Sequence, residues 1–100
     1  MENDTDGATA ELQRLAAEIS VLLARLQTEY TRYLTGAEKK APVVLRTKLD
    51  QTAQRARTLV RQCQNRALIF KAQEVLNKVQ LYSVAWDKKL AALEKTSSKK

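Results

Sequence analysis

The sequence predicts an all-α fold, an antiparallel three-helix bundle with coiled-coil-like packing, and three observations support this prediction. Hydrophobic residues make up 44% and charged residues 29% of the 100 residues, which is typical of a folded chain with one modest core. Only two glycines and one proline interrupt a sequence rich in good helix formers. Apolar residues also recur at three- and four-residue spacing in separate segments. We therefore expect one domain over residues 9–94, between a disordered acidic N-terminus (1–8) and a disordered basic tail (95–100).

The first helix is predicted from Thr9 to Leu34. Its apolar stripe has a heptad pattern that comprises Leu12, Leu15, Ile19, Leu22, Leu26 and Tyr33, with Ala16, Leu23 and Tyr30 beside them. Thr9 or Asp6 can cap its start, because their side-chain oxygens accept hydrogen bonds from the first free N–H groups. Gly36 can end it, because glycine adopts the backbone conformation found at helix ends without strain.

The second helix is predicted to begin near Pro42, after a connection. Pro42 disfavours helical geometry at Ala41 but fits the first turn of a new helix. The inward line of this helix carries mostly small side chains, namely Leu45, Leu49, Thr52, Ala56, Leu59 and Cys63. Cys63 is the only cysteine and so cannot form an intrachain disulfide, and its spacing from Leu59 predicts a small core residue rather than a nucleophile.

The third helix carries a longer apolar line. Its members are Leu68, Ala72, Val75, Val79, Tyr82, Trp86 and Leu93, with Ile69, Leu76 and Leu90 beside them. The step from Cys63 to Leu68 shifts the phase of the apolar pattern, which predicts a bend near residues 64–66. Asn65 is the only residue there with turn character. The alternative is therefore one continuous helix over residues 43–94, in a long hairpin that dimerises. In the bundle, Trp86 is expected to be buried against the first helix.

Two segments carry distinctive patterns of aromatic residues, and the first also contains a glycine and a proline. Tyr30–Pro42 reads tyrosine, aromatic, glycine, acidic, basic and proline, and Phe70–Lys88 reads phenylalanine, basic and glutamine before Tyr and Trp-Asp. Roughly residues 26 to 94 thus resemble an uncharacterised helical domain of myxobacteria and related delta-proteobacteria, often found at the C-terminus of larger proteins; Ala72 and Lys88 depart from its pattern. The resemblance implies a fold and a lineage, but no reaction. Its signature residues, Tyr30, Tyr33, Gly36, Pro42, Tyr82 and Trp86, either fix helix ends and a core or form a partner-binding surface.

Positive charge is concentrated in the middle of the chain. Eighteen basic residues against eleven acidic ones give a net charge of +7. The candidate partner-binding residues are Lys39, Lys40, Arg46, Lys48, Arg55, Arg57, Arg61 and Arg66. Between residues 39 and 66 the only acidic residue is Asp50. Arg46, Arg57 and Arg61 are expected to project away from the core line of the second helix. Lys48, Arg55 and Arg66 are expected to flank that line on the other side. A solvated face that aids solubility would show the same pattern.

Catalytic chemistry has little support in this sequence. With no histidine, one cysteine and two isolated glycines, the chain lacks the commonest general base, a zinc-binding cluster and a phosphate-binding loop. We expect no enzyme activity, no cofactor and no metal. The acidic start is unlike a signal peptide, and apolar runs of about four residues are far short of the roughly twenty that span a bilayer, so a cytoplasmic location is expected.

The sequence therefore favours a non-enzymatic helical protein-interaction module, such as a small adaptor or regulator. Heptad patterning without catalytic residues motivates this prediction. The expected partner is another protein, with an acidic surface to match the basic one, and a monomer is favoured over a homodimer. The alternative is a nucleic-acid-binding protein that uses the basic surface of the second helix, because phosphate backbones attract clustered positive charge.

Overall fold

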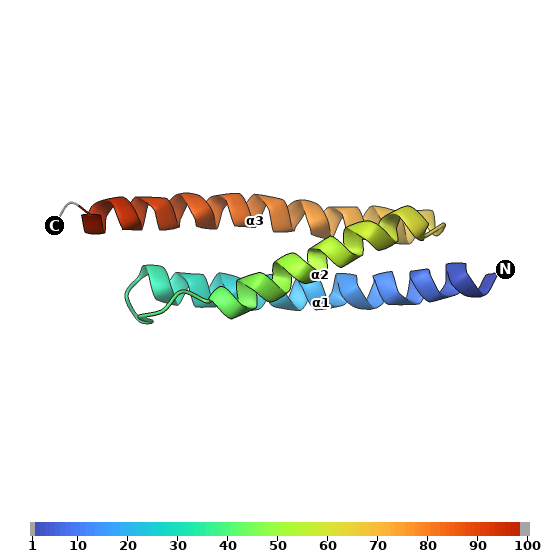
Figure 1. Cartoon of the computed structure of the whole chain (residues 1–100), viewed down its shortest axis with the longest axis horizontal. Coiled ribbons are helices and arrows are strands. Elements are labelled where there is room, and N and C mark those ends of the chain that lie inside the picture. The colour runs from blue at the N-terminus through green and yellow to red at the C-terminus, as the bar shows by residue number, and fades with distance from the viewer. Residues whose placement is uncertain (1, 99–100) are drawn as a thin grey trace.

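The chain forms an all-α bundle of three helices, which confirms the predicted fold class. The computed structural model describes the backbone of residues 2–98 and the side chains of residues 7–95. Its helices are α1 (Glu2–Leu34), α2 (Val43–Gln62) and α3 (Arg66–Ser98). Consecutive helices run in opposite directions in an elongated bundle of 62 × 18 × 16 Å (Figure 1). The continuous helix over residues 43–94 is not formed.

The connections are made by the residues that the sequence marked for them. Gly36 has a φ of 87°, a left-handed conformation that glycine adopts without strain and that ends α1. Cys63 leaves the helical conformation after α2, while its N–H still donates to the Leu59 carbonyl at 2.9 Å. Asn65 then caps α3, because its Oδ1 accepts a hydrogen bond from the Leu68 N–H at 3.1 Å. The phase shift in the apolar pattern therefore marks a true break.

The outer ends of α1 and α3 differ from the prediction. Because α1 begins at Glu2, Thr9 and Asp6 lie inside it and neither is its N-cap. Acidic residues stabilise a helix when they lie near its N-terminus, where the helix dipole is positive, and this is consistent with a helix that begins at Glu2. At the other end, α3 continues to Ser98, past the predicted bound at residue 94. Residues 1 and 99–100 of the two predicted disordered ends lie outside the described residues.

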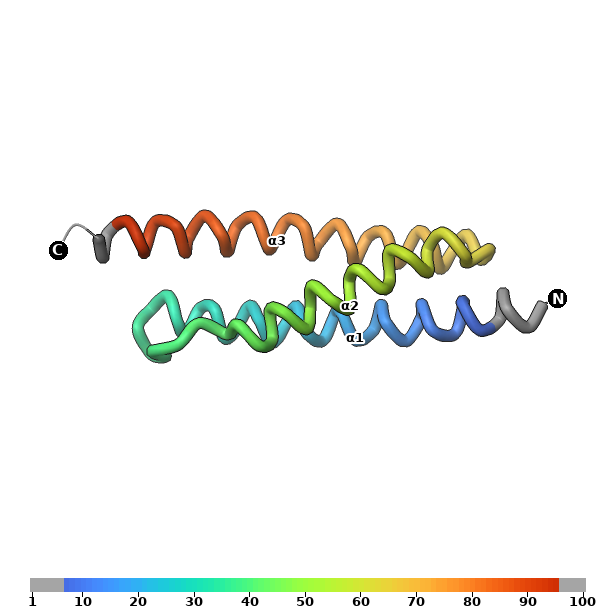
Figure 2. The backbone as a smooth tube through the Cα atoms, in the orientation of Figure 1, coloured from blue at the N-terminus to red at the C-terminus, as the bar shows by residue number. Residues whose placement is uncertain are grey.

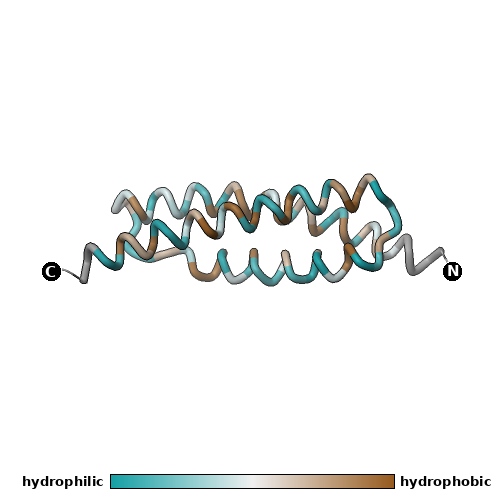
Figure 3. Tube along the Cα trace, turned by 90° about the horizontal axis from the view of Figure 1, so that it is seen from above, coloured by the Kyte–Doolittle hydropathy of each residue, from teal (hydrophilic) through white to brown (hydrophobic). Residues whose placement is uncertain are grey.

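The stripe of α1 supplies most of the core. Its buried residues are Ala8, Leu12, Leu15, Ala16, Ile19, Leu22, Leu23, Leu26 and Tyr30. They include every residue that was predicted to face inward except Tyr33, which is half-buried. Hydrophobic positions recur along the helices between hydrophilic ones (Figure 3), as the amphipathic pattern requires.

The shorter helix α2 contributes mainly small side chains. Its buried residues are Leu49, Thr52, Ala53 and Ala56, while Leu45 and Leu59 are half-buried. Small residues permit a close approach between helices, and α2 crosses obliquely from the C-terminal half of α1 to the start of α3 (Figure 2). Both α2 and α3 pack mainly on α1 and touch each other less. The interface between α2 and α3 is therefore the smallest of the three.

The inward face of α3 is narrower than predicted. Ala72, Leu76, Val79 and Trp86 are buried there, and further apolar residues of the predicted line, among them Leu68, Val75 and Leu90, pack partly against the core.

None of the helices in the described part of the chain has a stretch long and apolar enough to cross a membrane.

Replacement of Ile19 by alanine tests the role of the α1 stripe. Ile19 is fully buried, so Ile19→Ala should lower the free energy of unfolding by about 2–5 kcal/mol through lost burial and a residual cavity. Val21 lies on the same helix and is 66% exposed, so Val21→Ala should change it by about 0.5 kcal/mol or less. Urea unfolding followed by circular dichroism measures both values, and similar losses for the two variants would contradict the assignment of the core.

Candidate functional site

An aromatic cluster joins α1 and α3. Trp86 is only 3% exposed, and its ring centroid lies 4.7 Å from that of Tyr30. The Trp86 Nε1–H donates a hydrogen bond to Gln27 Oε1 at 3.2 Å, so the polar end of the indole is satisfied in the interior. The structure thus confirms that Trp86 is buried against α1.

Tyr82 does not lie in the core, although the sequence placed it there. It is 39% exposed and packs edge-on against Trp86, with ring centroids 5.8 Å apart. The larger Trp86 ring fills the space beside α1, and Tyr82, one helical turn earlier, lies outside it. The signature residues of the resemblance therefore divide between interior and surface.

Arg46 connects the aromatic cluster to α2 and is largely buried, with a side chain 18% exposed. Its Nη1 donates to Tyr30 Oη at 3.0 Å, and its Nη2 lies 3.2 Å from Asp87 Oδ1. The Nε lies 3.8 Å from Asp50 Oδ1. The guanidinium also lies over the Trp86 ring, with Cζ 5.5 Å from the centroid, a favourable cation–π distance. One side chain therefore contacts all three helices.

The prediction that Arg46 projects away from the core is wrong. The shoulder of α2 that carries Arg46 faces α3, where Asp87 and the aromatic rings offer it partners. Burial lowers the pKa of Arg46, but the hydrogen bond to Tyr30 and the charges of Asp87 and Asp50 more than offset burial and leave the pKa above its ordinary value. Arg46 therefore stays charged and holds the helices together.

The other seven candidate residues, Lys39, Lys40, Lys48, Arg55, Arg57, Arg61 and Arg66, are exposed, as predicted. They do not form one surface. Lys39 and Lys40 lie in the connection before α2, and Arg66 begins α3. The remaining four divide between the two shoulders of α2, so the basic residues of this helix do not lie on a single face.

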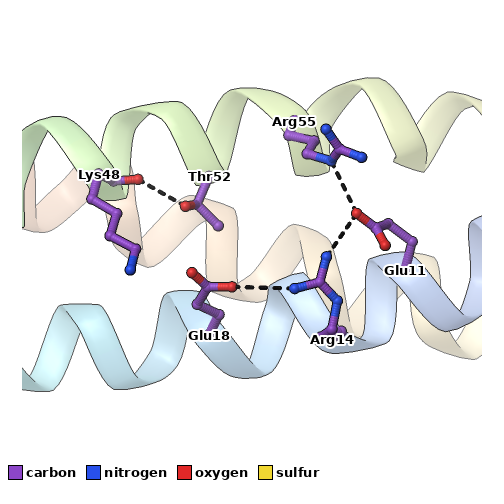
Figure 4. Close-up of polar contacts among 6 residues, drawn as sticks. All are labelled: Glu11, Arg14, Glu18, Lys48, Thr52 and Arg55. Carbon is purple, nitrogen blue, oxygen red and sulfur yellow. Dashed lines mark hydrogen bonds and ion pairs between the residues drawn. The ribbon is translucent and has the colours of Figure 1, made fainter.

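The shoulder of α2 that faces α1 is partly neutralised by acidic residues. Arg55 Nε lies 3.0 Å from Glu11 Oε2, which also accepts a hydrogen bond from Arg14 at 2.8 Å (Figure 4). Arg14 in turn lies 3.6 Å from Glu18. The hydrogen bond from Arg14 is the main reason that the pKa of Glu11 lies below its ordinary value. Lys48 lies on the same shoulder, and its carbonyl accepts a hydrogen bond from Thr52 (Figure 4).

The shoulder that faces α3 borders two adjoining hollows, which we call the α2–α3 groove. One hollow has a volume of 280 Å³ and the other 550 Å³, and Arg57 lines both. Lining side chains include Asp50, Gln54, Arg57 and Arg61 from α2, and Gln73, Asn77, Gln80, Ser83, Val84 and Asp87 from α3. Asp50 and Asp87 are paired with Arg46. Arg57 and Arg61 have no ion pair with any described residue.

Exposed apolar side chains lie along the outside of α3, with the exposed polar residues Glu74 and Asn77 between Phe70 and Leu81 on the same face. Phe70, Leu81 and Val84 are 67%, 68% and 48% exposed, and their spacing of eleven and three residues places them on one helix face. We call these three residues the α3 outer patch. Because Val84 also lines the groove, the patch adjoins it. Our sequence reasoning missed this surface, although Leu81 and Val84 fall off the inward line of α3 and could have signalled it.

Arg46→Lys tests whether Arg46 is structural. A lysine ammonium lacks the planar fork that reaches Tyr30 and Asp87 together, so this variant should lose about 1–3 kcal/mol of unfolding free energy. Arg57→Lys, on the same shoulder but exposed, is the matched control and should change it by about 0.5 kcal/mol or less. Urea unfolding measures both. An Arg46→Lys variant as stable as the wild type would show that the guanidinium contacts do not hold the helices.

Comparisons with known proteins point to no function, so the function of this chain has to be inferred from the chemistry of its surface. The chain matches no protein-family model, no curated protein and no solved structure. The resemblance to a myxobacterial helical domain therefore stays a prediction. Within residues 7–95, no group of three His, Cys, Asp or Glu side chains is placed to hold a metal ion.

Proposed function

We propose that this chain is a non-enzymatic helical protein-interaction module, such as a small adaptor or regulator, that docks another protein along α3. The observation that supports the proposal is the α3 outer patch. Exposed apolar residues are ordinary when they are scattered. Here Phe70, Leu81 and Val84 share one helix face, and Val84 also lines the groove, an arrangement that suits the docking of an amphipathic helix.

The proposed module acts as a monomer in the cytoplasm. The core of one chain already buries the stripe of α1 and the inward faces of α2 and α3. Cys63 is a free thiol, which suits a reducing compartment because thiols persist there without pairing.

Nucleic-acid binding is a second candidate, favoured by Arg57 and Arg61, which are exposed and have no ion pair with a residue that the structure describes. Affinity for a phosphate backbone grows with the number of phosphates that basic residues neutralise together. On α2, however, Arg46 is engaged with Asp87 and Arg55 with Glu11. We therefore expect only weak binding of duplex or single-stranded nucleic acid, screened by physiological salt.

Phe70→Ser/Leu81→Ser tests the docking proposal. Partners captured by the tagged wild-type chain from its native cell are identified and purified, and each affinity is then measured with the purified chain. A true partner should bind the double variant about tenfold or more weakly, because buried anchors dominate interface energy. Val21→Ser, also at an exposed apolar position, is the control and should bind like the wild type.

Circular dichroism should show the same helix content in both variants, because these side chains are exposed. The proposal would be contradicted if every purified partner bound the double variant as tightly as the wild type.

A further inference from the structure

We infer that the occupant of the α2–α3 groove is an acidic amphipathic helix of a partner protein. This inference rests on the proposed function and adds the chemistry of the partner. The apolar side chains of that helix cover the α3 outer patch, and its carboxylates pair with Arg57 and Arg61. Each part of this arrangement follows from a different feature of the groove.

The two walls of the groove differ in character. Arg57 and Arg61 stand on the α2 wall, while Val84 on the α3 wall leads to the exposed apolar face that includes Leu81 and Phe70. A ligand that fills it must therefore be apolar on one side and anionic on the other. A helix meets this requirement, because residues three and four apart share one face.

The length of the α3 outer patch sets the length of the occupant. Phe70 and Leu81 are eleven residues apart, which at 1.5 Å per residue is roughly 16 Å along α3. A helix that covers both therefore has at least three turns. Apolar residues at positions i and i+11 would cover Phe70 and Leu81, while polar residues at i+4 and i+7 would face Glu74 and Asn77, which are exposed on the intervening turns of the same α3 face.

The unmatched charge of the groove sets the sign of the occupant. Arg57 and Arg61 are separated by one turn of α2, and like charges at this spacing destabilise a helix. At the other end of the groove, Asp50 and Asp87 are already paired with Arg46. Arg46, Arg57 and Arg61 against Asp50 and Asp87 leave the groove with a net positive charge, which is concentrated at Arg57 and Arg61 because neither has an ion pair with a described residue. Two carboxylates one turn apart on the partner helix complement these two arginines.

Other occupants match these features less well. Nucleic-acid phosphates would pair with Arg57 and Arg61, but they gain nothing from Leu81 or Val84. A second copy of the chain would have to present an acidic helix face. On α1, however, Arg14 and Arg25 are exposed among the glutamates, so that helix is not a uniformly acidic ligand.

Two synthetic peptide helices of at least three turns test this inference on the full chain. The first carries leucines on one face and glutamates beside them, and its twin has lysine in place of each glutamate. Fluorescence anisotropy of the labelled peptides gives the affinities. At about 50 mM NaCl the acidic peptide should bind about tenfold or more tightly than its twin, and at about 300 mM NaCl the difference should shrink.

Charge reversal on α2 should invert this preference. The variant Arg57→Glu/Arg61→Glu is expected to bind the lysine twin better than the acidic peptide, because the wall of the groove becomes negative. The matched control Arg25→Glu/Arg32→Glu reverses two exposed charges on α1, away from the groove and the α3 outer patch, and should keep the wild-type preference. Phe70→Ser/Leu81→Ser should weaken both peptides.

Several results would overturn the inference. Equal binding of the two peptides, or no binding of either, would remove the acidic helix as the occupant. Tighter binding of a DNA duplex that Arg57→Glu/Arg61→Glu abolishes would assign the groove to nucleic acid. Loss of peptide-binding capacity as the protein concentration rises would assign it to a second copy.

The failures of the inference and of the proposed function can be told apart. A purified natural partner that Phe70→Ser/Leu81→Ser releases, but Arg57→Glu/Arg61→Glu does not, would refute the acidic occupant alone. A partner that neither double variant releases would refute docking along α3 as well.

Discussion

The apolar stripe of α1 is the constraint on which the rest of the structure depends. Leu12, Ile19 and Leu26 are completely buried along it, and both other helices pack against it. Because burial of apolar surface is the main force that favours folding, α2 and α3 take the positions that cover this stripe. Their contacts with each other are secondary, and this is why the space between them stays open as a groove.

The polar contacts between the helices follow from this arrangement, in which α2 and α3 pack on α1 and touch each other less. Where α2 and α3 come together beside Tyr30 and Trp86, Arg46 fills the gap with a charged group that is paired with Asp87. A buried charge is tolerated only with such partners. Arg57, farther along the same shoulder, lines the same hollow as Asp50 and Asp87 but forms no ion pair with any described residue. One helix face thus carries a structural arginine and an arginine available to a ligand.

Much of the fold could be predicted from the sequence, because the heptad of α1 and the phase shift before Leu68 are local patterns. The candidate site was less accessible. Periodicity placed Arg46 and Arg57 on one shoulder, but it could not show that Asp87, far away in the sequence, forms an ion pair with Arg46 and not with Arg57. Tyr82 was misplaced for a similar reason, since the inward face of α3 is decided by where Trp86 meets α1.

The central claim is that one chain completes its own core around α1, so that the α3 outer patch is left for a partner. Sedimentation equilibrium tests it most directly. The account predicts the monomer mass of 11.3 kDa at protein concentrations from about 1 to 100 µM, the range in which a tight dimer would stay associated. A dimer throughout this range that Leu81→Ser dissociates would contradict the account, because the α3 outer patch would then belong to the fold of the protein itself.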